Sequence, residues 1–160
     1  MAEETKVSMY VTKDCLVVPI QEELHMESLH RIQEDILNRV YEKSIKGVII
    51  DVTGVAIIDR LIAQKIFDSA RMASLLGAET VITGLRPGTV SSLVDLEFDQ
   101  GDVTTAINLE GGFRLLEPII RNKKEGEEAV EPEPELDQEQ EDGKTREAEI
   151  DEAEEQRRKN

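Results

Sequence analysis

Short apolar runs and longer stretches with helical spacing alternate along the first 120 residues of the chain. Residues 15–20 and 48–52 are almost continuously apolar and rich in β-branched side chains, which predicts buried strands, and residues 80–83 form a third such run. Residues 7–11 alternate as in a half-buried strand, and residues 103–106 suit a short edge strand. Helical spacing covers residues 26–41 and 60–76, and two further helices are expected at residues 87–96 and 109–120.

This order of elements predicts an α/β fold: a mostly parallel sheet of about four to five strands, flanked by about four helices and joined by right-handed crossovers. Gly47 is expected to end the first helix in a left-handed turn, and Asp59 is a suitable N-cap for the second. The loops after Val52 and Thr83 should meet at one edge of the sheet. That edge is the usual functional face of an open α/β sheet.

Composition divides the chain into two parts. The formal net charge is −16, and much of it lies beyond Arg121, in a segment rich in glutamate that has few apolar and no aromatic residues. Such a segment buries too little apolar area to offset the entropy of ordering it. We therefore expect a folded domain over residues 1–120 and a disordered acidic tail over residues 121–160.

The charge and the remaining composition limit the partners and the location. A strongly acidic chain repels phosphates, so nucleic acid is not an expected partner. The acidic N-terminus lacks the apolar core of a signal peptide, and no apolar run is long enough to span a membrane, which indicates a cytoplasmic protein. The single cysteine, Cys15, is expected to be a small buried hydrophobe at the start of a strand.

Motifs for catalysis or cofactor binding are not evident. The stretch from Gly84 to Gly88 contains glycines, but Pro87 removes a backbone donor that a phosphate cradle needs. His25 and His30 are five residues apart, which places them on different faces of a helix rather than together at a metal. Asp51 and Asp59 are best explained as a strand-end residue and a helix cap. No cofactor and no enzymatic activity are expected.

Arg60 is the unusual residue of the chain. A cation in the first turn of a helix opposes the helix dipole, at a cost of about 0.3–1 kcal/mol. Local rules tend to be broken at functional sites, so Arg60 is a candidate contact. An exposed arginine that lies over a neighbouring helix explains the same pattern, and sequence physics alone leaves both alternatives open.

The segment from residue 17 to 116 resembles the STAS domain family of anti-sigma factor antagonists, which has a SpoIIAA-like fold. Within that family it is most similar to the single-domain scaffold subunit of the bacterial stressosome, the RsbS type. The resemblance rests on the following stretches: Val18-Pro19-Ile20 with Glu23-Leu24, Gln33-Glu34-Asp35, Gly47-Val48-Ile49-Ile50-Asp51, Ile58-Asp59, Leu75-Leu76-Gly77-Ala78, Thr83-Gly84-Leu85-Arg86-Pro87 and Ala106-Ile107-Asn108-Leu109-Glu110.

The resemblance implies a non-enzymatic regulator. Family members bind a serine/threonine switch kinase or an anti-sigma factor, and they assemble with other STAS-domain proteins. The resemblance implies the following partner-binding residues: Asp59, Arg60, Thr83, Gly84 and Arg86. In typical members the residue after the Ile-Asp pair is a serine or threonine whose phosphorylation releases the partner.

This chain departs from the family at that position, because Arg60 has no hydroxyl to accept phosphate. Ser92 and Thr83 are the candidate phosphosites that remain near the same edge. The departure implies either a binding state that phosphorylation of this loop cannot switch off or a partner with a complementary acidic residue. The alternative function is a STAS-type sensor of a small ligand or nucleotide at the ends of the strands. An enzyme is the least supported class.

Overall fold

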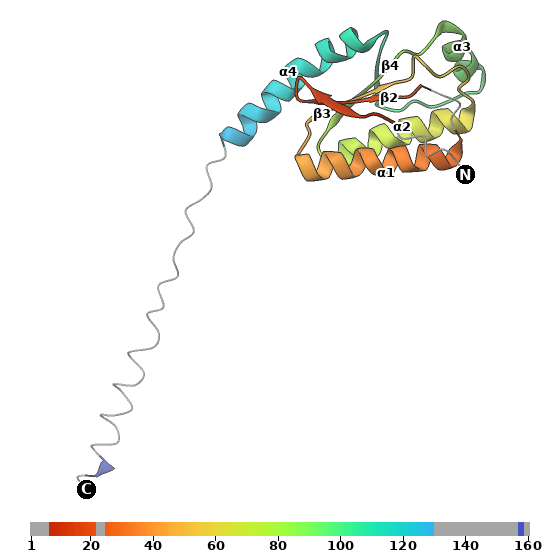
Figure 1. The fold of residues 1–160 in the computed structure, drawn as a ribbon. Helices are drawn as coiled ribbons and strands as arrows, with labels where there is room; N and C mark the ends of the chain where they lie inside the picture. The colour runs from red at the N-terminus through yellow and green to blue at the C-terminus, as the bar shows by residue number, and fades with distance from the viewer. Residues whose placement is uncertain (1–6, 22–24, 130–156, 159–160) are drawn as a thin grey trace. The chain divides into compact units, whose positions relative to one another are not determined.

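A computed structural model describes residues 7–21, 25–129 and 157–158. Contacts divide the chain after Ala129, and the fold described below is that of the part before this residue. The elements run in the order β1 (Tyr10–Thr12), β2 (Cys15–Pro19), α1 (Met26–Lys43), β3 (Gly47–Asp51), α2 (Arg60–Leu75), β4 (Glu79–Thr83), α3 (Pro87–Asp95), β5 (Thr104–Ala106) and α4 (Leu109–Glu128) (Figure 1).

One sheet of five strands carries the fold, in the spatial order β1-β2-β3-β4-β5. Strand β1 pairs antiparallel with β2, and the three remaining pairs are parallel. The predicted α/β class and the mostly parallel sheet are therefore confirmed. The register between β3 and β4 sets Asp51 beside Thr83, so that both strands end at the same level.

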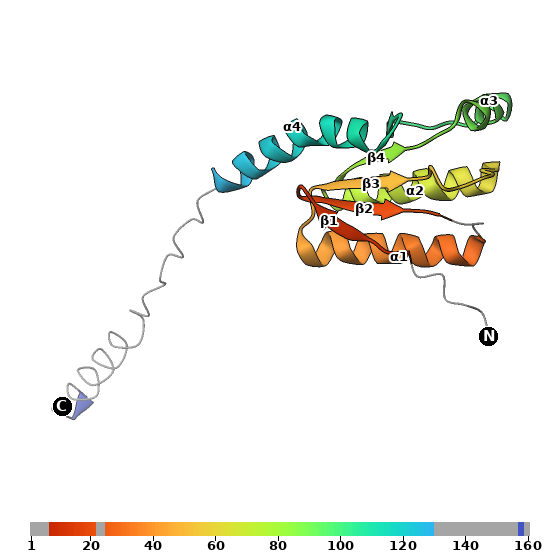
Figure 2. The ribbon, with the colours of Figure 1, turned by 45° about the horizontal axis from the view of Figure 1, so that its top comes forward.

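Helices cover both faces of the sheet. Helices α1 and α2 lie together on one face, and α4 lies on the other (Figure 2). The larger core lies under α1 and α2 and includes Leu16, Ile36, Ile50 and Ile82, whereas a smaller core under α4 includes Ile49 and Leu116. The two helices α1 and α2 are also joined by a buried hydrogen bond from Gln33 Nε2 to Ser69 Oγ, 3.2 Å long. Figure 2 shows α3 beyond the carboxyl ends of β3 and β4.

Helix α4 is longer than predicted, because it continues past residue 120 to Glu128. Polar contacts hold its last turns to the domain: Lys46 pairs with Glu127, Lys124 Nζ lies 2.8 Å from Asp14 Oδ2, and Lys123 Nζ donates to Gly77 O. Residues 121–128 of the predicted tail are therefore helical, and residues 130–156 of it lie outside the described part of the chain.

The end of α1 also differs from the prediction. Ser44, with a φ of 49°, takes the left-handed position, and Gly47 is already the first residue of β3. Gly47 packs closely against α4, since a Cβ there would lie 2.7 Å from Ile120 Cδ1. The helical spacing places Tyr41 on the buried stripe of α1, but its side chain is 78% exposed, whereas that of Val40 beside it is buried.

Cys15 is buried at the start of β2, as predicted. Burial raises the pKa of its thiol from 9.0 to about 11, and the nearby charge of Asp14 adds to the rise. A raised pKa in the folded state gives a contribution to stability that is complete below pH 9.0 and is lost as the pH rises toward 11.

We therefore expect the free energy of unfolding of the wild-type chain to fall by on the order of 1–3 kcal/mol between pH 9.0 and about 11 because of this thiol. A Cys15→Val variant should not show this loss. Urea unfolding of both proteins across this range measures the difference, and the variant corrects for every other group that titrates there. If the free energies of unfolding of the two proteins change with pH in the same way, the fold does not raise the pKa of the Cys15 thiol.

Candidate functional site

The carboxylate of Asp51 ties together the loops that follow β3 and β4. Its Oδ1 accepts hydrogen bonds from Thr53 N at 3.1 Å, from Thr53 Oγ1 at 2.6 Å and from Thr83 Oγ1 at 3.2 Å. Arg86 Nη2 donates to Thr53 O across the same gap, at 3.1 Å. The predicted meeting of the two loops at one edge of the sheet is therefore confirmed, and Asp51 is the strand-end residue that fixes it.

Gly84 permits this close approach of the loops. Its φ is +84°, a conformation that residues with a Cβ rarely adopt. A Cβ at this position would also lie 2.6 Å from Thr53 N and 2.8 Å from Asp51 Oδ1, and it would overlap Thr53 Oγ1. Gly84 is thus part of the framework of the site and offers no side chain to a partner.

Thr83 belongs to the same framework. Its side chain is fully buried, because Gly112 of α4 packs directly over it, with a Cβ at Gly112 only 2.9 Å from Thr83 Cγ2. Its hydroxyl is already engaged by Asp51. The sequence placed Thr83 among the candidate partner-binding residues and phosphosites, and the structure places its side chain in the interior at this edge of the sheet.

Asp59 and Arg60 begin α2, where both side chains are exposed. Asp59 is the predicted N-cap, and its Oδ1 accepts from Ile62 N at 2.8 Å. Arg60 Nη1 donates to the carbonyl of Leu96, the C-cap residue of α3, at 3.0 Å. Arg60 opposes the dipole of its own helix but complements the carbonyl end of α3.

A shallow hollow of about 370 Å³ lies next to these residues. It is formed by two segments, residues 56–58 before α2 and residues 86–92 at the start of α3, and its lining residues are Ala56, Ile57, Ile58, Arg86, Gly88, Thr89 and Ser92. We call the surface made by residues 56–61 and 86–92 the docking face. Ser92 is exposed on it, and its hydroxyl donates to Gly88 O at 3.0 Å.

Two large apolar side chains on the docking face were not predicted. Ile57 is 77% exposed and Leu61 is 61% exposed, although Ile58 and Ile62 beside them turn toward the core. The sequence does indicate this exposure. Ile57-Ile58 and Leu61-Ile62 are adjacent apolar pairs near the start of α2, and only one residue of each pair can point toward the core. Asp59, Arg60 and Arg86 surround them as exposed polar residues.

The docking face shows no arrangement for metal chemistry. No group of three or more His, Cys, Asp or Glu side chains in the described ranges is placed to hold a metal ion. Within those same ranges, every helix is too short or too polar to cross a membrane.

Several known proteins are similar to this chain. The RsbT co-antagonist protein RsbRA of Bacillus subtilis is 31% identical over 104 residues, which cover 65% of this chain and 38% of that protein. The chain thus spans well under half the length of this curated relative. RsbS of Moorella thermoacetica has a similar structure, with a TM-score of 0.64 and 28% identity over 73% of this chain and 99% of that one.

A chain in a structure of the stressosome, described as a signal integration and transduction hub, gives a TM-score of 0.62 and 29% identity, and covers 71% of this chain and 99% of that one. These likenesses agree with the fold built above from the residues. The family model described as STAS domain matches residues 6–108, which is more than half of the sequence. The chain therefore belongs to the STAS domain family.

Proposed function

We propose that this chain is a non-enzymatic, cytoplasmic regulator, acting as an anti-sigma factor antagonist or a stressosome scaffold. Its partner is a serine/threonine switch kinase or an anti-sigma factor, which binds the docking face around Asp59 and Arg60. Other STAS-domain proteins, including copies of the same chain, are its assembly partners. The names of the relatives support this proposal, since one is an RsbT co-antagonist and another is part of a stressosome structure.

The observation that carries the proposal is the chemistry of the docking face. Ile57 and Leu61 expose large apolar area beside Asp59, Arg60 and Arg86. A cluster of exposed apolar side chains rimmed by polar groups is typical of a protein interface. The hydrogen bonds of Asp51 and the conformation of Gly84 hold the loops in place, so partner binding costs little conformational entropy in these loops.

Arg60 stands where the resemblance places a phosphorylatable hydroxyl. Its guanidinium is exposed and carries a positive charge. Arg60 has no hydroxyl for a serine/threonine kinase to phosphorylate, so the proposed docking face presents a constant cation there. The partner contact at α2 is then fixed rather than switched.

We expect Arg60→Glu to weaken partner binding by about tenfold or more, and Arg60→Ser to weaken it less. The reason is that glutamate reverses the charge offered to the partner, whereas serine only removes it. Titration calorimetry of the three proteins with the host's purified counterpart of RsbT measures the effect. Equal affinities for wild type, Arg60→Ser and Arg60→Glu would remove Arg60 from the interface.

Ser92 is the remaining accessible candidate for a phosphate switch. It lines the hollow together with Arg86, and a phosphate there would add nearly two negative charges to the docking face. We expect one phosphate in the wild-type chain after incubation with the host's switch kinase, and none in Ser92→Ala, by intact-mass spectrometry. Thr83→Val serves as the control and should incorporate phosphate normally, because Thr83 is buried. Incorporation that persists in Ser92→Ala would rule out this site.

A further inference from the structure

Helix α2 carries a row of side chains on the side that faces away from the sheet. The spacing along the row is four, three, four and three residues, and its members are Leu61, Lys65, Asp68, Met72 and Leu75. This is the a/d spacing with which one helix of a coiled coil packs against another. The buried residues of α2 lie on its opposite side, against the sheet and α1. We call the row of five residues the α2 seam.

Both ends of the α2 seam are apolar and exposed. Leu61 is 61% exposed, Met72 39% and Leu75 87%. Helix α1 lies beside α2, to which the bond from Gln33 to Ser69 joins it, and α4 lies across the sheet (Figures 1 and 2). The three apolar side chains therefore face solvent in the single chain. Large apolar side chains at this spacing are typical of a helix that packs against a further helix.

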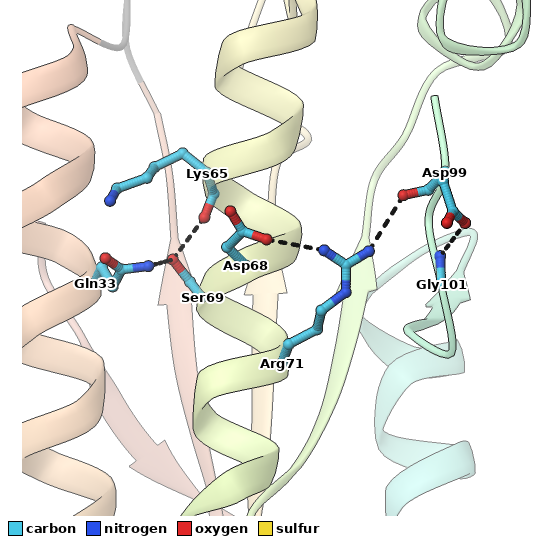
Figure 3. A network of polar contacts seen from close by, with 7 residues as sticks. All are labelled: Gln33, Lys65, Asp68, Ser69, Arg71, Asp99 and Gly101. Carbon is cyan, nitrogen blue, oxygen red and sulfur yellow. Dashed lines mark hydrogen bonds and ion pairs between the residues drawn. The ribbon is translucent and has the colours of Figure 1, made fainter. Parts of the chain in front are cut away.

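The centre of the α2 seam carries one charge of each sign (Figure 3). Arg71 Nη1 donates to Asp68 Oδ1 at 2.8 Å, and within the described residues Oδ2 of Asp68 accepts no hydrogen bond. Lys65 takes part in none of the ion pairs formed among those residues. Figure 3 shows its side chain extending away from Asp68, toward α1. One carboxylate oxygen and one ammonium group are therefore left to pair with a second chain.

Two copies of α2 match each other along this row when they run antiparallel. A two-fold axis midway between residues 66 and 67 sets Leu61 opposite Met72 of the other copy, and Lys65 opposite Asp68. Each of these contacts occurs twice, once on either side of the axis. A parallel pairing would instead set Lys65 beside Lys65 and Asp68 beside Asp68, which places like charges together in the seam. The row is thus self-complementary in one direction only.

We propose that α2 binds α2 of a second copy of this chain, as an antiparallel two-fold pair through the α2 seam. The proposal rests on the proposed function, in which copies of the chain are assembly partners, and names the surface that they use. Burial of the apolar side chains supplies the affinity, and the ion pairs between Lys65 and Asp68 fix direction and register. Leu61 also belongs to the docking face, whereas Lys65, Asp68 and Met72 lie outside it.

Sedimentation equilibrium of the full-length chain alone, from about 5 to 200 µM, tests the pairing. We expect the wild type to shift with concentration from 18.0 kDa toward twice that mass. Met72→Glu should weaken the association about tenfold or more, because it brings a carboxylate into the apolar part of the seam. The matched control Leu115→Glu changes a residue of similar exposure, 42% against 39%, on α4, and should associate like the wild type. A wild type that stays at 18.0 kDa would overturn the proposal, as would equal association of Met72→Glu and wild type.

Exchange of the two charges tests the direction and the register. Lys65→Glu sets a second carboxylate opposite Asp68 of the other copy, and Asp68→Lys sets a second ammonium opposite Lys65. Each variant alone should therefore associate about tenfold more weakly than the wild type. An equimolar mixture of the two should recover the association, because a carboxylate then faces an ammonium at both contacts. No recovery from variants that keep the circular dichroism of the folded chain would overturn the antiparallel register.

These outcomes are distinct from those of the docking face. Sedimentation is measured without the host's counterpart of RsbT, so a monomeric wild type would remove the pairing of α2 and leave partner docking in place. Met72→Glu should bind that counterpart at least as tightly as the wild type does, because Met72 lies outside the docking face. Loss of this binding in Met72→Glu would assign the α2 seam to the partner and overturn the pairing of copies.

Discussion

Replacing Gly84 with alanine is expected to lower the free energy of unfolding by about 3 kcal/mol or more, the largest effect of any single exposed or half-exposed glycine in the domain. Two costs add at this position. Alanine has to adopt a φ of +84°, and its Cβ has to share space with Thr53 N and Asp51 Oδ1 at 2.6 and 2.8 Å. Relief of the overlap moves the Thr53 loop away from Asp51 and disturbs the docking face along with the fold.

Two other glycines separate these costs. Gly77 also has a positive φ, of +90°, but open space surrounds it, so Gly77→Ala isolates the conformational cost of about 1 kcal/mol. Gly88, in the first turn of α3, has neither a positive φ nor a neighbour within 4 Å, and Gly88→Ala should be neutral or stabilising by up to about 1 kcal/mol. Urea unfolding of the three variants gives the comparison. A Gly84→Ala variant no less stable than Gly77→Ala would contradict the close packing of the two loops.

Local sequence signals predicted the parts of the site that depend on neighbours in the chain. Asp59 caps α2 through a hydrogen bond to a residue three positions away, and residue type alone indicates such a cap. The meeting of Asp51 and Thr83 follows from topology, because adjacent parallel strands of equal length end at the same level. The α/β class and the meeting of the two loops at one edge of the sheet were predictable for these reasons.

Contacts between distant parts of the chain were not predictable in the same way. The bond from Arg60 to Leu96 joins residues 36 positions apart, and it depends on how α3 lies over the start of α2. Burial of Thr83 depends on its contact with Gly112, which lies on α4 in a distant part of the chain. In the structure the absent side chain of Gly112 lets α4 approach the sheet. The length of α4 likewise depends on ion pairs and hydrogen bonds made by residues 123–127 outside the helix.

The second large effect concerns binding rather than stability. Ile57 is 77% exposed on the docking face, and Tyr41 at the end of α1 is 78% exposed, away from the strand ends that carry that face. The two side chains therefore offer matched apolar exposure in different places. Changing either to glutamate should leave the free energy of unfolding within about 0.5 kcal/mol, since neither is packed in the core. Only the Ile57 variant places a charge in the proposed interface.

The affinity of Ile57→Glu and Tyr41→Glu for the host's purified counterpart of RsbT, measured by titration calorimetry beside the wild type, tests the docking face most directly. We expect Kd to rise by about thirtyfold or more for Ile57→Glu, because a buried apolar contact at the centre of an interface is replaced by an unpaired charge. Tyr41→Glu should bind like the wild type. Wild-type affinity in Ile57→Glu, together with loss of binding in Tyr41→Glu, would contradict the account and place the interface at the opposite end of the domain.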